Sequence, residues 1–539
     1  MIVPGSAHAL LISTSGYTIP YSLRFRAANS AYLSRTPASS SSQTTYTFSY
    51  WFKRGNLNAQ QQHFAVGTNS QNYFVLGFGF ISGNDQLNVV WAASNVITAR
   101  RQTNRVFRDP SAWYHVVVAL DTGNATANSR VRVYVNGVEE TSFANSVNPT
   151  QSSNQHGWNT NVANYIGAGL PTYGMYHDGY MAEVNFIDGQ ALTPSSFGQT
   201  DSGTGVWVPK KYSGTYGTNG FYLKFADAAS TTTIGNDSSG NANNWTTSGI
   251  SVTSGTTFDQ MTDTPTLNYC VLSQINRQSV VTISEAGLYQ SYSGSANTGV
   301  SQGTMAVSIG KWYYEHTVGA IGSFDYYLGV MLASVSTVNN GVNYIYTGTS
   351  GSGEYAYRFN AQKGSNGTYT SYGATYAAND VIGVALNLDA GEITFYKNGV
   401  SQGVAFTGIS GTYVPFCQTY GGGSAYLNFG QRAFAYTPPT GFKALNTANI
   451  ASAAVTTSGS FTGNAAADGP FIWANGNPAT LTINGNAVTF GTHADKTAGG
   501  FKLRTSSASY NTSGTNNWTA TAGKRFVQSK KPNNAQVNP

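Results

Sequence analysis

Carboxylates are the side chains with which a search for chemistry in this sequence begins. The segment HDGYMAEVNFIDG carries Asp178, Glu183 and Asp188 at a spacing of five. Hydrolysis of a glycoside needs two carboxyl groups that flank one bond, but residues five apart in a strand point to opposite faces of the sheet. Glu183 is therefore interpreted as a structural, hydrogen-bonded carboxylate. Asp178 and Asp188 could bind Ca²⁺ through loop oxygens, although ordinary turn aspartates are the favoured interpretation.

The sequence contains no other catalytic constellation. Its seven histidines are scattered, with no H-E-x-x-H, and neither a G-x-S-x-G elbow nor a phosphate-binding loop occurs. His115, within WYHVVVAL, alternates with apolar residues and is expected to pack in a core. Cys270 and Cys417 are too few for a disulfide framework, so both are interpreted as small buried hydrophobic residues, with one bridge as the alternative. We therefore predict no catalytic residues, no cofactor and a protein that is not an enzyme.

Exposed aromatic residues are the sequence sign of sugar binding, because their faces stack on the C–H groups of a sugar ring. Two loops are rich in them. The first supplies the candidate ligand-binding residues Tyr173, Tyr176, His177 and Tyr180. The second supplies the candidates Tyr344, Tyr346, Tyr355 and Tyr357. Tyrosines pack between subunits as readily as against sugars, so a subunit contact is the alternative for both clusters.

The elements that must position these loops are strands. Apolar residues alternate with polar ones over four to eight residues throughout the chain, which indicates strands rather than helices. In RVRVYVNG, Val131, Val133 and Val135 point to one face, and the Asn-Gly that follows suits a type I′ hairpin turn. Because a lone hairpin cannot bury its apolar face, the expected architecture is all-β, with serial sandwiches.

Composition supports several such domains. A chain of 539 residues is too long for one hydrophobic core, so three or four domains are expected. Asp, Glu, Lys and Arg make up 9% of the residues, where about 25% is typical. Aromatic residues reach 13%, which excludes ordinary disorder. Polar, uncharged β surfaces of this kind suit contacts between copies or with neutral glycans.

The positive charge is unevenly distributed. The net charge is +6, and the chain after Asp495 has seven basic residues and no acidic one. A second basic cluster, expected in a loop, consists of Arg100, Arg101, Arg105 and Arg108. Neither cluster shows the aromatic interleaving of a nucleic-acid site, so we predict no nucleic-acid partner. No run approaches the eighteen apolar residues of a membrane span, and no basic region precedes HALLI, so neither membrane insertion nor a secretory signal is expected.

Two parts of the chain resemble known domain families. The series WYHV, VYVNG and GYMAEVNF, in this order within residues 21–200, resembles laminin-G/concanavalin-like lectin domains. The segments GKWYYEHTV, YYLGVML and VIGVALNLDAGEITFYKNGV, within residues 264–445, resemble a SPRY domain. Both families have β-sandwich folds. The laminin-G-like fold is shared with glucanases, but their alternating Glu, Asp and Glu on one strand face is missing here.

The remaining segments complete the predicted organisation. Residues 201–263 are expected to form a β connector and residues 446–539 a small C-terminal β domain. The order of all these parts, with GQALTPSSFG and GTYGTNGFYLKFAD, resembles virion proteins of tailed bacteriophages. This resemblance implies a structural protein made in the host bacterial cytoplasm and carried on the virion. The favoured role is a tail fibre or appendage that presents carbohydrate-binding modules for host attachment.

Several alternatives stay open at this point. A head-decorating or tail-cladding protein without receptor binding would share the same composition, and a glycan depolymerase is a further alternative. Expected partners are other virion proteins, further copies in a homo-oligomer such as a trimer, and a host surface glycan. Residues 1–20 are uncharged apart from the terminus and His8 and are predicted to anchor the chain, with the basic C-terminal region as the competing anchor.

Overall fold

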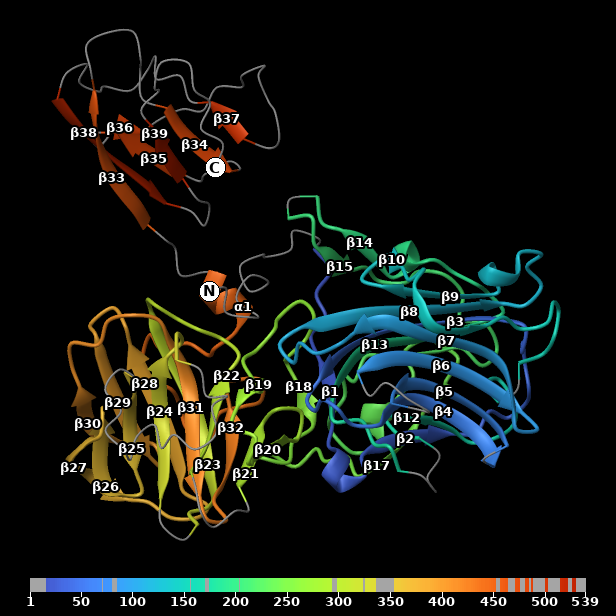
Figure 1. The fold of residues 1–539 in the computed structure, drawn as a ribbon, viewed down its shortest axis with the longest axis horizontal. Helices are drawn as coiled ribbons and strands as arrows, with labels where there is room; N and C mark the ends of the chain where they lie inside the picture. Colours follow the sequence, from blue (N-terminus) through green and yellow to red (C-terminus); the bar gives the residue numbers. More distant parts are fainter. Residues whose placement is uncertain are drawn as a thin grey trace. The chain divides into compact units, whose positions relative to one another are not determined.

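The computed structural model describes the chain in two parts. It describes residues 16–69, 71–79, 85–155, 157–169, 174–202, 204–292, 298–322, 325–335 and 353–451, and the backbone of strands between residues 456 and 529. The chain divides into one compact unit of residues 1–450 and a second of residues 451–539. The described residues are almost all β, as predicted (Figure 1), and their α-helix is α1 (Thr447–Ala451). No helix among them is long and apolar enough to cross a membrane.

The larger unit begins with a sandwich of two eight-stranded antiparallel sheets, called sheet A and sheet B. Sheet A has the order β10 (Val138–Glu139), β9 (Val131–Val135), β8 (Trp113–Asp121), β3 (Thr45–Arg54), β13 (Gly179–Asp188), β1 (Ser22–Phe25) and β18 (Gln260–Met261), with β16 (Phe221–Leu223) beside β13. Sheet B has the order β11 (Phe143–Val147), β7 (Val96–Val106), β6 (Gln86–Ala93), β5 (Asn72–Phe78), β4 (Gln61–Asn69), β12 (Asn164–Ile166), β2 (Tyr32–Arg35) and β17 (Thr246–Ser248).

Aromatic side chains fill the space between sheets A and B. Phe48 lies at the centre, with its ring 4.8 Å from Trp158, 5.0 Å from Phe64 and 5.5 Å from Phe74. These contacts follow from alternation, because every second residue of each strand faces the same side of its sheet. The predicted turn after β9 is present, with φ of 49° at Asn136 and 81° at Gly137, the positive pair that a type I′ turn requires.

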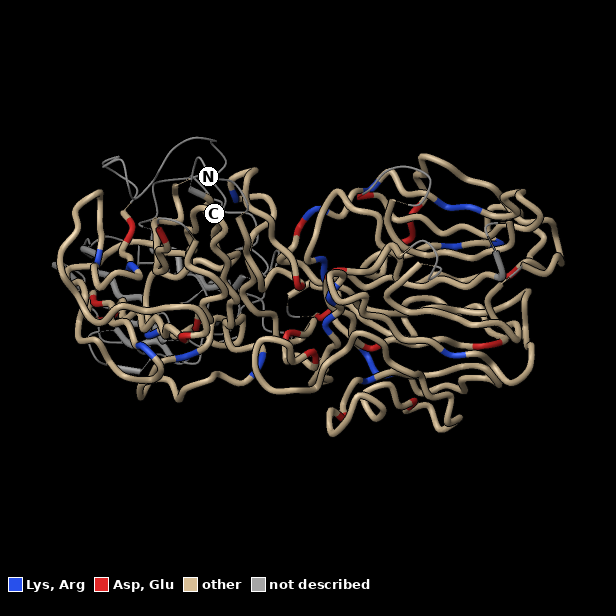
Figure 2. The backbone as a smooth tube through the Cα atoms, turned by 90° about the horizontal axis from the view of Figure 1, so that it is seen from below, with Lys and Arg blue, Asp and Glu red and all other residues tan. Residues whose placement is uncertain are grey.

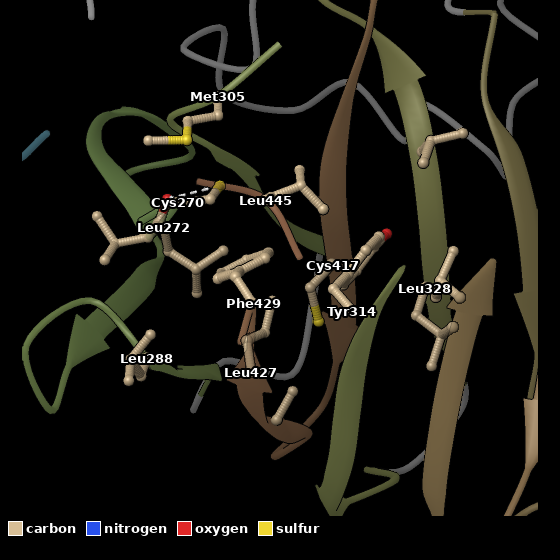
Figure 3. Close-up of a cluster of buried hydrophobic side chains, with 14 of the residues drawn as sticks. Cys270, Leu272, Leu288, Met305, Tyr314, Leu328, Cys417, Leu427, Phe429 and Leu445 are labelled. Atoms are coloured by element: carbon tan, nitrogen blue, oxygen red, sulfur yellow. Dashed lines mark hydrogen bonds between the residues drawn. The ribbon is translucent and has the colours of Figure 1, made fainter. Parts of the chain in front are cut away.

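A second sandwich follows, made of sheets C and D with seven strands each. Sheet C has the order β19 (Leu272–Arg277), β22 (Thr298–Gly303), β31 (Tyr413–Tyr420), β24 (Tyr326–Leu332), β25 (Tyr355–Arg358), β26 (Asn360–Ser365) and β27 (Thr368–Thr375). Sheet D has the order β20 (Val281–Ser284), β21 (Tyr289–Tyr292), β32 (Ser424–Asn428), β23 (Lys311–Ala320), β28 (Val381–Asn387), β29 (Glu392–Lys397) and β30 (Val400–Phe406). Its core includes both cysteines, which are free and buried (Figure 3).

The two sandwiches share a hydrophobic core. Trp51, Trp113 and Tyr180, on the outer face of sheet A, belong to the same buried cluster as Cys270 and Leu272 of the second sandwich. Residues 201–263, which the sequence suggested as a connector, supply β16 and β18 to sheet A and β17 to sheet B. The second sandwich therefore covers the outer face of sheet A around Trp51, Trp113 and Tyr180. Charged residues of both signs gather where the sandwiches meet (Figure 2).

The unit of residues 451–539 is described through its strands alone. A four-stranded sheet has the order β33 (Thr456–Gly463), β38 (Gly514–Thr521), β35 (Thr480–Ile483) and β36 (Asn486–Ala487). A three-stranded sheet has the order β37 (Gly500–Lys502), β34 (Phe471–Asn475) and β39 (Phe526–Ser529). Asn484 and Gly485, a pair that suits a further hairpin turn within LTINGNAVTF, lie outside the described residues.

Candidate functional site on the outer face of sheet B

Two of the predicted ligand-binding residues of the first loop, His177 and Tyr180, are fully buried. His177 bonds through Nδ1 to Gln61 Oε1 at 3.1 Å, and its ring lies 4.8 Å from that of His63. Burial lowers the pKa of His177 to about 3, with a further contribution from Arg54, so the imidazole is neutral at physiological pH. Tyr180 lies in the core between the sandwiches. Neither residue faces solvent, and neither could contact a glycan in this state.

Tyr176 is the predicted residue of this loop that remains partly exposed. Its ring stacks on Tyr32 of β2, with 6.3 Å between centroids and 22° between planes. Tyr32 in turn meets Tyr165 of β12 edge to face at 5.9 Å. All three are partly exposed. We call them the tyrosine cluster. Tyr173 lies outside the described residues.

The two aspartates suggested for calcium lie far apart. Asp178 immediately precedes β13 and Asp188 ends it, so about 33 Å separates them at the rise of a strand. Asp178 accepts the backbone N–H groups of Glu285 and Ala286. Asp188 accepts hydrogen bonds from Ser41, Asn159 and Asn219. They cannot share one ion, and the described residues contain no group of three or more His, Cys, Asp or Glu side chains that could hold a metal.

The described candidate tyrosines of the second loop lie in the second sandwich, whereas those of the first loop lie in the first sandwich. Tyr357 is fully buried, donates its hydroxyl to Ala374 O and packs its ring 5.4 Å from Phe395. Tyr355 is half-buried, with its ring 5.1 Å from Phe406. Both contribute to the core of the second sandwich. Tyr344 and Tyr346 lie outside the described residues.

Sheet B presents a continuous row of side chains on its outer face. Direct cross-strand pairs join Val147, Arg100, Val90, Val75, Ala65, Tyr165, Ser34 and Thr246 in that order, one residue from each of the eight strands. Directly opposed residues lie on the same face. The row is apolar in the middle, where Ala65, Val75 and Val90 pack under Tyr73 and Ile97. Tyr165 of the tyrosine cluster flanks this apolar stretch on one side, and Arg100 flanks it on the other.

Amides surround the guanidinium at the polar end. Arg100 Nη2 donates to Gln102 Oε1 at 2.7 Å and to Asn88 Oδ1 at 3.2 Å. Gln102 Nε2 donates to Gln86 Oε1 at 2.7 Å, and Asn145 Nδ2 donates to Gln102 Oε1 at 2.6 Å. We call these five side chains the amide ladder. It holds one cation and no carboxylate, so its charge is not neutralised within the ladder.

The dimensions suit an extended ligand. Four strand spacings separate Arg100 on β7 from Tyr165 on β12, about 19 Å at the usual distance between strands. An aromatic surface at one end and amide donors and acceptors at the other are the groups that bind sugar rings and their hydroxyls. The eight described residues of the row include no carboxylate, whereas hydrolysis of a glycoside needs two.

The sequence did not reveal this face. Tyr32, Tyr165, Asn88, Arg100 and Gln102 were not predicted as site residues. Arg100 and Arg101 were expected in a loop, whereas both lie within β7 and pair with β6, so that prediction is wrong. A signal was available in the alternation of ITARRQTN, whose every second residue faces one side of a sheet. The run of arginines and amides obscured it, because strands are usually recognised by apolar residues.

Comparison with known proteins identifies both sandwiches. Residues 27–196 match the concanavalin A-like lectin/glucanases superfamily, and residues 311–432 match the SPRY domain family. A concanavalin-like domain and a SPRY domain therefore follow one another in this chain, as predicted. Solved structures of the SPRY domain of human HERC1 and of a human SPRY domain are similar at 20% and 16% identity. They cover 27% and 29% of this chain, and 91% and 98% of their own, each with a TM-score of 0.23.

A curated relative corrects one prediction. The E3 ubiquitin-protein ligase RKP of Arabidopsis thaliana is 37% identical over 147 residues, which are 26% of this chain and 11% of that protein. The prediction that the chain is not an enzyme is contradicted by this relative, which is named as a ligase. The chain spans only about a tenth of the relative's length, and the two matched domains are of binding types. They indicate a binding or interaction role.

Proposed function

We propose that this chain is a recognition protein whose first sandwich binds glycans along the outer face of sheet B. The observation that carries the proposal is the row across that sheet, with the tyrosine cluster at one end and the amide ladder at the other. Tyrosine rings supply stacking surface, and amides supply fixed donors and acceptors. Tyr32, Tyr165 and the amide ladder are placed on strands, which hold side chains more rigidly than loops do.

We further propose that the chain is carried on the virion of a tailed bacteriophage, in a tail fibre or appendage that attaches to the host. Support comes from the order of its domains and from the segments that resemble phage virion proteins. In this setting its partners are other virion proteins, further copies of the chain in a homo-oligomer, and a glycan of the host surface. The charge-poor, tyrosine-rich surface suits such contacts. A head-decorating or tail-cladding role is the alternative, and localisation on labelled particles separates the two.

The experiment is binding of the purified chain to host cells and to their isolated surface polysaccharide. Tyr32→Ala and Tyr165→Ala are each expected to weaken binding, because about 1 kcal/mol is typical of an aromatic contact. Tyr289→Ala is the matched control, since Tyr289 also packs against another half-buried tyrosine, Tyr426, at 4.6 Å, but in the second sandwich. Equal binding by all three variants would refute the site. Release of soluble oligosaccharide would instead assign depolymerase activity.

The ligase relative favours a second candidate function. In that case the chain would recognise a protein partner for a ubiquitin-transfer assembly, with the SPRY domain as the recognition module. The supporting observation is the 37% identity over 147 residues. Incubation of the chain with ubiquitin, an activating enzyme and a conjugating enzyme tests it. Ubiquitin chains that form only when the protein is present would favour this function over glycan recognition.

A further inference from the structure

Arg100 carries an unusual charge for its position. Its side chain lies in the middle of β7 and is only 7% exposed. The neighbouring arginines are neutralised or bonded to backbone: Arg105 pairs with Glu140 at 2.6 Å, and Arg101 donates to the carbonyl of Val147 at 3.0 Å. No described carboxylate pairs with Arg100. Its Nη2 atom donates to the neutral side-chain oxygens of Asn88 and Gln102.

One N–H donor of the Arg100 guanidinium has no partner. Its Nε atom is buried and makes no hydrogen bond, although a guanidinium has five N–H donors arranged for planar acceptors. Burial lowers the pKa of Arg100, opposed by the nearby Tyr73. Buried charges in proteins are normally paired, because an unpaired one costs several kcal/mol. Arg100 is a cation held among neutral amides, and its Nε–H donor is unpaired. This arrangement needs an explanation.

The surroundings of Arg100 indicate what could complete it. Arg100 belongs to the row of residues that also contains Tyr165 of the tyrosine cluster. The planar guanidinium binds carboxylate and phosphate groups alike, and a single cation balances the single negative charge of a carboxylate. Sulfated or phosphorylated polymers are usually held by several basic side chains, and Arg100 is the one cation of this row.

We infer that the outer face of sheet B selects saccharides that carry a carboxylate, with Arg100 as the counter-charge and the tyrosine cluster as the stacking surface for neighbouring sugar rings. This inference rests on the proposed function, because it specifies the ligand of the same face. A neutral glycan of the same shape would leave the charge of Arg100 unpaired and would therefore bind more weakly.

The test uses a panel of oligosaccharides built from galacturonate, glucuronate, mannuronate or guluronate. Each is measured as the free acid and as its methyl ester, beside neutral and sulfated oligosaccharides of equal length. The full chain is titrated calorimetrically as wild type, Arg100→Gln, Arg100→Lys and Arg105→Gln. Arg105→Gln is the matched control, because it removes the same charge from the same strand, at an ion pair whose guanidinium is about half exposed. Circular dichroism verifies that each variant is folded.

The inference expects at least one free acid to bind about tenfold or more tightly than its ester, the effect of a single charged hydrogen bond. Arg100→Gln should abolish that preference, Arg100→Lys should keep part of it, and Arg105→Gln should keep all of it. Binding that is equal for acid and ester, or strongest for the sulfated polymer, would overturn the inference and leave glycan recognition standing. Absence of binding to every oligosaccharide would overturn both.

Discussion

Lys53 and Asp263 form an ion pair at 2.7 Å in which neither side chain is exposed to solvent. Lys53 lies on β3 of the first sandwich, and Asp263 begins the segment that enters the second. Lys53 Nζ also donates to Asn268 Oδ1 and to the carbonyl of Tyr269, while Trp113 donates to the other oxygen of Asp263. The pair thus fixes the start of the SPRY-like sandwich to sheet A.

Breaking this pair should be costly. Lys53→Met leaves a buried carboxylate without its counter-charge, and such changes lower the free energy of unfolding by about 3–5 kcal/mol. Lys53→Met combined with Asp263→Leu should cost less than the sum of the single changes. Urea denaturation measures all three. Arg132→Gln, which breaks a pair with Glu139 that is partly exposed on both sides, serves as the control and should cost less than about 1 kcal/mol. If Lys53→Met lowered the free energy of unfolding by less than about 1 kcal/mol, the pair would not hold the junction between the sandwiches.

Gly55 marks the closest approach between the sandwiches. A Cβ atom at this position would lie 2.3 Å from the Cα of Ala286 and 2.6 Å from Asp178 Oδ1. Gly55→Ala should therefore separate the contact and lower the melting temperature by several degrees. Gly123→Ala is the matched control, because the nearest atom to its Cβ is a carboxylate oxygen at 3.3 Å. Limited proteolysis between residues 262 and 270 should accelerate only in the Gly55 variant, and equal rates in both variants would contradict the assignment.

Two buried histidines should respond oppositely to replacement by leucine. His316 on β23 is buried, and neither ring nitrogen has a hydrogen-bond partner. His115 is equally buried, but its nitrogens bond to Ser49 Oγ at 2.9 Å and to Trp207 Nε1 at 3.0 Å. His316→Leu removes an unsatisfied polar group and should be neutral or stabilising, whereas His115→Leu should cost about 1–3 kcal/mol. Thermal denaturation decides, and a large loss for His316→Leu would reveal a partner that the fold requires.

The pH dependence of stability should carry opposite signatures from His316 and Asp178. Burial lowers the pKa of His316 to about 3 and raises that of Asp178 to about 6. The histidine takes up a proton on unfolding below its ordinary pKa of 6.5, so its contribution to stability is lost as the pH falls from about 6.5 to 3. Asp178 binds a proton more readily in the folded protein than in the unfolded chain. Its contribution to the free energy of unfolding therefore increases as the pH falls from about 6 to 4.

Substitution isolates each term. His316→Leu should flatten the fall in unfolding free energy at acid pH by about 1.4 kcal/mol per pH unit, the value of one proton. Asp178→Asn should steepen the fall by a similar amount between pH 6 and 4. Denaturant titrations at half-unit pH steps give both slopes. If the Asp178 variant flattened the curve instead, the carboxylate would have to be ionised more readily in the folded state than in the unfolded chain.

Both cysteines should be inert in the folded protein. Cys270 and Cys417 are fully buried in the core of the second sandwich, among Leu427 and Phe429 (Figure 3). Burial raises the pKa of Cys270 to about 11 and that of Cys417 to about 12, so almost no thiolate exists at pH 8. A thiol reagent should modify neither residue until urea unfolds the chain. Ser213→Cys supplies an exposed thiol as the positive control, and rapid modification of the native protein would show that the core opens.

Local sequence patterns were enough to predict the sandwiches. The alternation of Val131, Val133 and Val135 corresponds to three buried residues of β9, and the Asn-Gly after them forms the expected turn. These features depend on residues within one or two positions of each other. The outer faces of the sheets depend on contacts between distant segments. Tyr180 is buried because the second sandwich, about ninety residues downstream, covers its face of sheet A, and no local pattern contains that information.

The tyrosine cluster was predicted only in part, because it too depends on contacts between distant segments. Tyr176 was predicted from its loop, but its partners Tyr32 and Tyr165 come from strands at opposite ends of the first sandwich in sequence. The pairing of β12 with β2 brings them together. Arg100 was misplaced because charged residues are uncommon on buried strand faces. The role proposed for it rests on its hydrogen bonds to the oxygens of Asn88 and Gln102, which are a property of the folded neighbourhood.

The buried junction also limits how such a gene can evolve by exchange of domains. A recombination event just before residue 263 would bring in a foreign second sandwich without the backbone turn that Asp178 binds, and without Asp263 opposite Lys53. The hybrid would inherit buried charges with no counterpart and would fold poorly. Viable exchanges are therefore expected to transfer both sandwiches as one inherited block, with breakpoints after residue 450, where the compact unit ends.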